Sequence, residues 1–378
     1  MSEPVLSMAQ PITLLQPARL EIGAGAITRL AAWAEPYKRV FVVAMVPTIG
    51  FVDRIGLMGA VETFIDIPPE PDLPAVEAVL AAARAFRPDL VIGLGGGSVM
   101  DVAKLVAVLW DSEQSVIDVV GVGKVWGRRS ALAQVPTTSG TGSEAGIRSL
   151  VTNPETLAKL AVESPFMLAD IAVLDPELTY SVPAAVTAAT GIDALAHCVE
   201  SFTNIKAHPL IDGYASLGIS LVGRYLARAV ADGRDTEARA GMMLASYYGG
   251  VCLGPVNTAG GHALAYPLGT RLKLPHGLAN AIIFPHMLAF NASARPGKTA
   301  VVAQSLGLSG VVATDSVLAE SLAYCRGLGL NMSLSSHGAS EQDLAAWAED
   351  AFAIKRLIDN NPRPLSVSDI LSIYRDAY

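Results

Sequence analysis

Four residues of the chain have the types and the spacing of ligands to one metal ion. Asp193 and His197 stand four positions apart in GIDALAH, and His262 and His276 bound the later segment HALAYPLGTRLKLPH. Residues four apart on a helix lie on one face, so Asp193 and His197 can point at the same spot. One carboxylate and three imidazoles suit Fe²⁺ or Zn²⁺, whereas Mg²⁺ and Ca²⁺ need more oxygen ligands. The spacing therefore predicts a site for Fe²⁺ or Zn²⁺.

A glycine-rich loop lies between an apolar run and an amphipathic one. The run DLVIGLG ends at Gly95, and Gly96, Gly97 and Ser98 lead into SVMDVAKL. A strand, a glycine turn and a helix N-terminus together present bare N–H groups and a positive dipole end to a pyrophosphate. A tight turn that needs glycine for its geometry has the same sequence, so this loop alone leaves both interpretations open.

A second loop of small and hydroxyl residues, PTTSGTGSE (136–144), follows the strand-like run ALAQV. The hydroxyls of Thr137 and Thr138 can donate hydrogen bonds to ribose or phosphate oxygens. Two such loops at strand ends of one sheet favour a nucleotide site over a plain turn.

The elements that must position these residues change character near the middle of the chain. The first half alternates short apolar runs with amphipathic helical ones, which indicates a parallel sheet covered on both faces. Beyond 171–179 the strand signal nearly stops, and Ala-rich helical stretches begin around Ala184, after Pro183. We therefore expect a Rossmann-like α/β dinucleotide-binding domain over 1–180 and an all-α metal-binding domain over 181–378.

Composition narrows the classes of protein that fit. A chain of 378 residues has room for two domains, and its formal net charge of −8 offers no basic surface for nucleic acid or an anionic membrane. Three cysteines without a CxxC pair indicate neither a disulfide framework nor a thiolate zinc site. The N-terminus lacks a basic segment followed by an unbroken apolar one, unlike a signal peptide. We expect a cytoplasmic protein that handles small molecules.

Five separated motifs resemble, in order and spacing, those of the iron-containing (group III) alcohol dehydrogenases. The motifs are GGGSVMDVAK, PTTSGTGSE, DPELT, TGIDALAHCVE and HALAYPLGTRLKLPHGLANAI, and the resemblance runs from about residue 15 to at least 290. It implies an oxidoreductase that interconverts an alcohol and an aldehyde or ketone by hydride transfer with NAD or NADP. The metal, Fe²⁺ or Zn²⁺, would act as a Lewis acid facing the nicotinamide in a cleft between the domains. The family also implies a homodimer or a higher homo-oligomer.

The resemblance assigns roles to individual positions of this chain. The metal ligands it implies are Asp193, His197, His262 and His276. The cofactor contacts it implies are Gly96, Gly97 and Ser98 on the pyrophosphate, Thr137 and Thr138 near the adenosine half, and Leu150 and Lys159 towards the nicotinamide half.

At one position the chain departs from the family in a way that bears on proton transfer. Most relatives carry a second histidine four residues after the ligand that matches His262, and this chain has Tyr266. One hypothesis makes Tyr266 a proton relay that needs help from the metal or a neighbour. The alternative is that Tyr266 fills the site while solvent relays the proton.

Two further departures concern the cofactor. The strand-like run RVFVVAM ends at Met45, where relatives that prefer NAD place an aspartate that repels a 2′-phosphate. Glu70 replaces an asparagine common at a cofactor-contacting position. Because the repelling carboxylate is missing, NAD and NADP both remain open.

Arg148 stands where relatives line the substrate pocket with a neutral side chain, and Asn257 and Thr258 add polarity just before His262. A guanidinium there could bind a carboxylate, phosphonate or sulfonate on the substrate. We hypothesise an anionic or polar substrate, with an arginine bonded to a carboxylate at the domain edge as the alternative.

Two other functions share these motifs. The same ligand set and nucleotide loop could serve a metal-dependent lyase or cyclase of the dehydroquinate synthase type, which uses NAD transiently. That class needs more basic residues around its phosphorylated substrate than this chain has near the metal. Maleylacetate reductases share the fold without a metal requirement, and the full set of Asp193 and three histidines argues against them.

Overall fold

The computed structural model describes residues 10–310 and 313–378. The first part of the N-terminal stretch that we judged unlike a signal peptide, residues 1–9, lies outside them. Across the described residues, no helix has the length and apolar character that crossing a membrane requires.

Contacts divide the chain into two compact units, each described here by itself. The first, which we call the sheet unit, comprises Leu15–Val182 and Gly233–Gly250. The second, the helical unit, comprises Pro183–Asp232 and Val251–Tyr378, with the described residues before Leu15. The segment 233–250 thus belongs with the sheet unit although it follows residue 180 in the chain. The division of function between an N-terminal and a C-terminal domain stays a prediction.

The sheet unit is built on a six-stranded sheet with the order β1-β9-β6-β4-β2-β3. Its strands are β1 (Arg19–Ile22), β2 (Arg39–Val43), β3 (Ala60–Phe64), β4 (Leu90–Gly95), β6 (Ala131–Pro136) and β9 (Ile171–Leu174). All neighbouring strands pair in parallel, which confirms the fold class predicted from the uninterrupted apolar runs.

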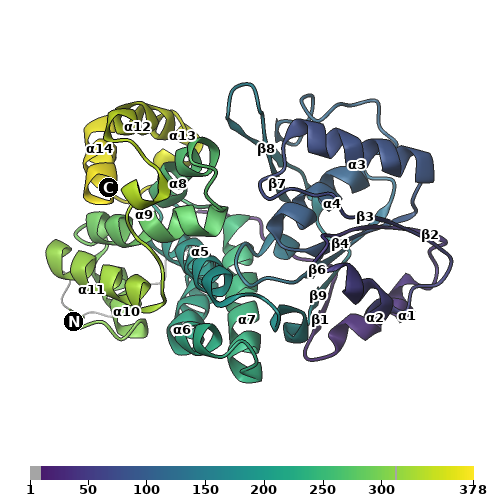
Figure 1. The fold of residues 1–378 in the computed structure, drawn as a ribbon, viewed down its shortest axis with the longest axis horizontal. Coiled ribbons are helices and arrows are strands. Elements are labelled where there is room, and N and C mark those ends of the chain that lie inside the picture. The colour runs from purple at the N-terminus through teal and green to yellow at the C-terminus, as the bar shows by residue number, and fades with distance from the viewer. Residues whose placement is uncertain (1–9, 311–312) are drawn as a thin grey trace. The chain divides into compact units, whose positions relative to one another are not determined.

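Helices cover both faces of this sheet, as Figure 1 shows. Phe41 and Val43 pack in one core with α3 (Leu73–Phe86) and α4 (Gly97–Leu109). Val40 and Val42, which point the other way, pack in a second core with α1 (Leu30–Ala34) and α2 (Val52–Ile55). Burial on both faces explains why the strands read as continuous apolar runs.

A small second sheet was not predicted. It has the order β5-β8-β7, from β5 (Gly121–Val122), β7 (Arg148–Thr152) and β8 (Lys159–Glu163), and β7 pairs antiparallel with β8. Along β7 buried and half-buried residues alternate, so the strand lacks the continuous apolar pattern of the main sheet. Leu150 and Lys159, two of the implied cofactor contacts, lie on these strands.

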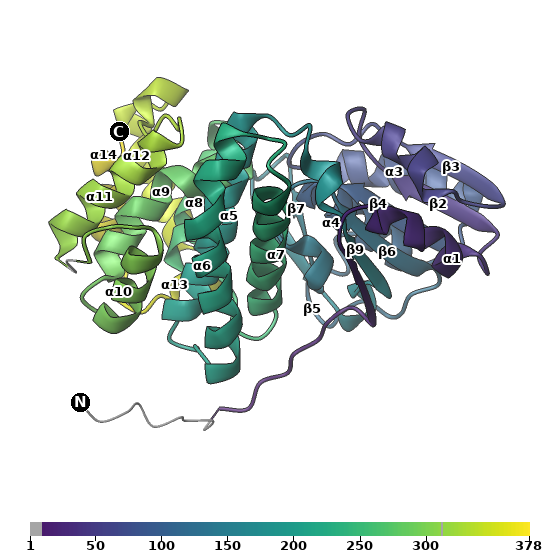
Figure 2. The same ribbon diagram turned by 90° about the horizontal axis from the view of Figure 1, so that it is seen from below.

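The helical unit confirms the prediction of a helix-rich second part. Its first helix, α5 (Ala184–Thr203), begins at the residue expected from the sequence, directly after Pro183. Helices α5 and α6 lie side by side, as Figure 2 shows. The remaining helices after α5 are α6 (Pro209–Ala231), α7 (Thr236–Leu253), α8 (Gly260–Arg271), α9 (His276–Asn291), α10 (Pro296–Ser305), α11 (Thr314–Gly327), α12 (Leu344–Phe352), α13 (Lys355–Ile358) and α14 (Val367–Asp376). Of α7, only the last residues belong to this unit.

Candidate metal centre and nucleotide loops

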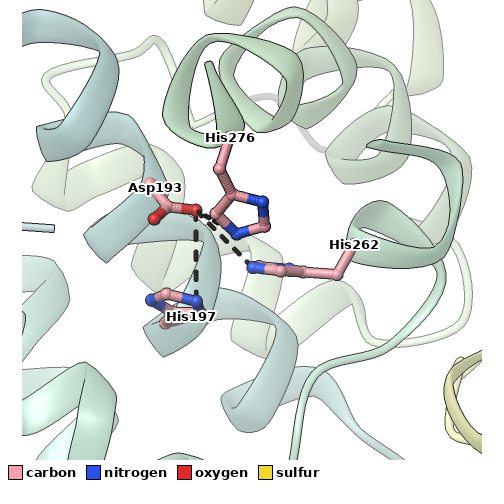
Figure 3. Close-up of side chains that lie close together, drawn as sticks. All are labelled: Asp193, His197, His262 and His276. Carbon is pink, nitrogen blue, oxygen red and sulfur yellow. Dashed lines mark ion pairs between the residues drawn. The ribbon is translucent and has the colours of Figure 1, made fainter. Parts of the chain in front are cut away.

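The structure brings the four predicted metal ligands together inside the helical unit, as Figure 3 shows. Asp193 Oδ1 lies 4.0 Å from His197 Nε2, 3.6 Å from His262 Nε2 and 3.7 Å from His276 Nε2. One ligand atom from each residue falls within 4.8 Å of all the others. Three side chains are buried and His276 is partly exposed. This spacing could hold one cation among one oxygen and three nitrogens.

Three helices supply these side chains. Asp193 and His197 share one face of α5, as their spacing of four residues predicts. His262 lies in the first turn of α8 and His276 is the first residue of α9, after the N-cap Pro275. The helix starts after residues 259 and 275 therefore decide where the last two imidazoles stand.

The tautomer of His262 is set by a buried carboxylate. Glu200 Oε1 lies 2.7 Å from His262 Nδ1, so the Nδ1–H donates to it and Nε2 is the ring nitrogen left for a cation. His262 Nε2 is buried and has no hydrogen-bond partner among the described residues. Buried polar atoms normally have a partner, and this nitrogen faces the Asp193 carboxylate. The donor set therefore fits a divalent cation.

The pKa values of the clustered side chains also indicate a cation site. Burial opposes ionisation of Asp193, but the nearby His197, His276 and His262 side chains outweigh it and bring the pKa of Asp193 below its usual value. Burial lowers the pKa of His197 to about 4. Burial also acts to lower the pKa of His262, but the Glu200 and Asp193 carboxylates outweigh it and raise that pKa to about 10. The cluster thus demands positive charge, which a proton or a divalent cation can supply.

A buried amide also orients the ligands. Asn280 Nδ2 lies 2.7 Å from Asp193 Oδ1 and 3.1 Å from His276 Nε2. Neither Glu200 nor Asn280 was among the residues predicted from the sequence. Their spacing carried a signal, since Glu200 follows Asp193 by two helical turns and Asn280 follows His276 by four residues.

Tyr266 lies beside the cluster on α8. Its ring centroid is 6.0 Å from that of His276, and Arg356 Nη2 on α13 donates a long hydrogen bond of 3.5 Å to its hydroxyl oxygen. Because the hydroxyl oxygen accepts from Arg356, its own proton remains available for donation. Arg356 was not predicted, since it is far from Tyr266 in sequence.

In the sheet unit, the two predicted nucleotide loops meet at the ends of adjacent strands. β4 pairs with β6, and Gly95 stands opposite Pro136 in the register. The Thr137 N–H donates to Gly95 O at 3.0 Å. A Cβ at Gly97 would come within 2.7 Å of the Thr141 side chain, so the loops are in contact only because residue 97 is glycine.

This arrangement leaves the amide groups at the start of α4 available. Gly96 is the N-cap, and no described side chain caps the helix there. Ser98, in the first turn, accepts the Glu70 N–H at 3.3 Å. Uncapped amides at the carboxyl end of a parallel strand suit a phosphate group. Gly96, Gly97, Ser98, Thr137 and Thr138 are thus brought together.

The two other implied cofactor contacts lie on the small sheet. The Leu150 N–H donates to Asp101 Oδ2 at 2.8 Å. Lys159 is almost fully buried, and its ammonium pairs with the Glu70 carboxylate. Through Glu70, Lys159 is connected to Ser98 in the glycine loop.

Arg148 is paired with a carboxylate. Its Nε donates to Glu163 Oε1 at 2.8 Å across the β7–β8 hairpin, and both side chains are partly exposed. This is the geometry that the alternative interpretation of Arg148 described. In the helical unit, Asn257 adopts a left-handed φ of 77°, and its Oδ1 accepts the Thr258 N–H at 2.7 Å.

A buried network of charged side chains next to the second loop, formed by Lys104 and Glu144, was not predicted. Lys104 Nζ donates to Ser143 Oγ and to the Arg148 carbonyl, each at 2.7 Å, and burial lowers the pKa of Lys104. Burial raises the pKa of Glu144 to about 7, against the opposing effect of the Lys104 charge. Glu144 Oε2 has no hydrogen-bond partner among the described residues.

Comparisons with known proteins find matches for both parts of the chain. Residues 17–176 match the family model described as iron-containing alcohol dehydrogenase, and residues 187–378 match that of the C-terminal part of the Fe-containing alcohol dehydrogenase family. Long-chain-alcohol dehydrogenase 1 of Geobacillus thermodenitrificans is 37% identical over 96% of this chain and 95% of its own length.

Solved structures are similar over nearly the whole chain. A 1,3-propanediol oxidoreductase is 30% identical with a TM-score of 0.92, covering 98% of this chain and all of its own. The sulfoacetaldehyde reductase of Bifidobacterium kashiwanohense, solved in complex with NAD⁺, is 29% identical with a TM-score of 0.86, covering 98% of this chain and 99% of its own.

Proposed function

The chain belongs to the iron-containing alcohol dehydrogenase family, and on that premise we propose roles for the residues that perform its reaction. It is a metal-dependent, NAD(P)-linked oxidoreductase that interconverts an alcohol and an aldehyde or ketone by hydride transfer. The family's cofactors are iron and NAD, and the comparisons favour neither the lyase nor the maleylacetate reductase.

Asp193, His197, His262 and His276 hold the metal in this proposal. The observation that carries it is His262 Nε2, which is buried, has no hydrogen-bond partner among the described residues and lies 3.6 Å from Asp193 Oδ1. When bound, the metal supplies Lewis acidity to the oxygen of an alcohol or carbonyl. Glu200 and Asn280 hold ligand side chains in place, and burial keeps bulk water away from Asp193, His197 and His262.

The nucleotide is held by the sheet unit in this proposal. The N–H groups of Gly97 and Ser98 at the start of α4, next to Gly96, would receive the pyrophosphate. Thr137 and Thr138 would bind the adenosine half. Leu150 and Lys159, on the small sheet, would contact the nicotinamide half.

Tyr266 is our candidate for the proton relay. Its hydroxyl oxygen accepts from Arg356, and its ring lies next to the ligand His276. A hydroxyl in this position could give a proton to a reduced carbonyl oxygen or pass one to solvent.

The substrate we propose carries an anionic or strongly polar group next to the reacting carbon. One relative of similar fold is a sulfoacetaldehyde reductase, an enzyme whose named substrate bears a sulfonate. Arg148 is the residue we assign to that anion, although its guanidinium also pairs with Glu163.

Two measurements test the proposed function. Metal analysis of freshly purified protein is expected to find close to one Fe²⁺ or Zn²⁺ per chain. NADH and NADPH consumption is then followed with aldehydes that do or do not carry a sulfonate or carboxylate. Absence of bound metal would refute the ligand assignment. Turnover that is equal for charged and uncharged aldehydes would refute the substrate class.

Assembly and location are the last parts of the proposal. We propose a homodimer or higher homo-oligomer, as the family implies, which light scattering on the purified protein tests. We also propose a cytoplasmic location, since three cysteines without a CxxC pair indicate no disulfide framework.

A further inference from the structure

Glu200 is a buried carboxylate that contacts a metal ligand without being one of the four. It lies on α5, two turns after Asp193, with only 8% of its surface exposed. Its Oε1 accepts from His262 Nδ1 at 2.7 Å. Its Oε2 accepts the backbone N–H of Ala259 and, at 3.4 Å, that of His262. A single carboxylate therefore contacts both the ring and the backbone of one ligand.

These contacts fix three properties of His262. The hydrogen bond at Nδ1 selects the tautomer whose Nε2 lone pair faces Asp193. The same bond fixes the rotation of the ring. The two backbone bonds fix the first turn of α8, whose N-cap Ala259 has no side-chain cap among the described residues.

The chain makes room for this carboxylate at one position. A Cβ on residue 261 would come within 2.5 Å of Glu200 Oε1, so Gly261 is needed for Glu200 to reach the His262 ring. On its other side Glu200 borders a cavity in the helical unit that Asn280 and Thr203 also line. Metal-bound histidines typically donate their second N–H to such a carboxylate, which makes the ligand more basic and fixes its orientation.

We propose that Glu200 is a positioning residue for the metal: it holds His262 in the tautomer and orientation that bind the ion, and so sets how tightly the ion is held. This inference rests on the metal-ligand part of the proposed function. It concerns retention of the metal, which is measured without turnover.

Glu200→Gln is the decisive substitution because it preserves shape and removes one acceptor. The two backbone N–H groups require the amide oxygen, so the amide NH₂ faces His262 Nδ1. Nδ1 must then accept, and the ring proton moves to Nε2, where the metal would bind. Glu200→Gln is therefore expected to bind Fe²⁺ about 10- to 100-fold more weakly than the wild type.

The matched control is Thr203→Val. Thr203 is buried on the same helix and lines the same cavity, and its hydroxyl bonds the Val199 carbonyl of its own helix at 2.9 Å. Affinity is measured by anaerobic titration of the metal-free protein with Fe²⁺ against a competing chelator. Wild type and Thr203→Val are expected to agree.

A purely structural role for Glu200, as a cap for α8, predicts a different result. Melting temperatures of the metal-free and Fe²⁺-loaded proteins separate the two roles. Glu200→Gln is expected to lose more melting temperature in the Fe²⁺-loaded protein than in the metal-free one, and so to gain less on loading. Glu200→Ala, which also removes the cap, is expected to melt lower in both states.

Three outcomes would overturn the inference. Fe²⁺ affinity of Glu200→Gln equal to that of Thr203→Val removes Glu200 from metal binding. A metal-free melting temperature that falls as much as the loaded one assigns Glu200 to the cap. If the wild type itself fails to bind Fe²⁺, the proposed function fails, and this inference fails with it.

Discussion

The amide nitrogen of Asn280 lies 2.7 Å from Oδ1 of Asp193, and both side chains are almost completely buried. This hydrogen bond joins α9 to α5 at the carboxylate around which the three histidines gather. Asn280 can donate from one nitrogen to Asp193 and towards His276 Nε2, 3.1 Å away. The carboxylate is thus oriented by a neutral group that leaves its negative charge in place for a cation.

Asn280→Ala is therefore expected to weaken metal binding while leaving all four ligands present. A buried hydrogen bond to a charged group contributes about 1.5 to 3 kcal/mol, so we expect Fe²⁺ affinity to fall about tenfold or more. The control is Asn291→Ala on the same helix, because Asn291 exchanges two hydrogen bonds with Asn361, at 2.8 and 3.0 Å. Asn291→Ala should lower the melting temperature without changing Fe²⁺ affinity. Equal affinities for the two variants would contradict the role given to Asn280.

Tyr266→Phe tests the proton relay. The substitution removes the hydroxyl that accepts from Arg356 and keeps the ring beside His276. We expect turnover to fall about tenfold or more with unchanged metal content, and the pH profile of kcat to change. Arg356→Gln, which keeps the tyrosine hydroxyl, should have a smaller effect. A Tyr266→Phe enzyme with the wild-type rate at every pH would show that solvent carries the proton.

Arg148→Ala tests recognition of an anionic substrate. If the guanidinium binds the substrate's anion, kcat/KM for an aldehyde with a sulfonate or carboxylate should fall about tenfold or more, and that for a simple aldehyde should not. Because Arg148 also pairs with Glu163, Glu163→Gln serves as the control. Glu163→Gln removes the negative charge that competes for the guanidinium and should preserve or improve activity on the charged aldehyde. If both variants lose activity alike on both kinds of aldehyde, Arg148 only holds the hairpin together.

The fold could be predicted where apolar residues followed a regular pattern and the sequence marked where the helix or strand begins or ends. The continuous apolar run of β4 and the helix start after Pro183 are examples, since burial on both sheet faces and the geometry of proline act locally. The β7–β8 hairpin was missed because its strands are half-buried and follow a loop rich in glycine and hydroxyl residues. Its pairing depends on contacts between strands that no single run of residues reveals.

The residues of the site were likewise only partly predictable from the sequence. Asp193 and His197 could be paired from their helical spacing. His262 and His276 lie on other helices, and they were grouped with that pair because the four residue types suit one metal ion, a set that the resemblance also implies. Partners that act across elements were not predictable. The contact between Arg356 and Tyr266 spans 90 residues, and neither side chain has a sequence pattern that indicates the other.

Met45→Asp tests the choice of cofactor. Met45 follows β2 by two residues, and its N–H donates to Thr48 Oγ1 at 3.1 Å. A carboxylate here would accept from a ribose hydroxyl and repel a 2′-phosphate. We expect the ratio of kcat/KM for NADH to that for NADPH to rise about tenfold, which corresponds to roughly 1.4 kcal/mol. Met45→Leu should leave the ratio unchanged. A ratio unaffected by the aspartate would mean that residue 45 does not face the adenosine ribose.

Glu144→Gln tests the buried network beneath the second nucleotide loop. Burial raises the pKa of Glu144 from 4.5 to about 7, so the folded protein holds this proton more tightly than the unfolded chain. The resulting stabilisation is fully present below pH 4.5 and is lost as the pH rises through about 7. Glutamine has no such proton to lose. Relative to the variant, the wild type should therefore lose up to about 3 kcal/mol of unfolding free energy between pH 4.5 and 7.

Urea unfolding of both proteins at half-unit steps of pH measures this difference. The positive charge of Lys104 acts to lower the pKa of Glu144. Lys104 itself donates hydrogen bonds to Ser143 Oγ and to the Arg148 carbonyl. The glutamine variant retains both of these hydrogen bonds. Glu35→Gln, a substitution at an exposed carboxylate, serves as the control. If Glu144→Gln follows the wild type, the carboxyl keeps its ordinary titration. The network would then hold a full negative charge against Lys104 near pH 7.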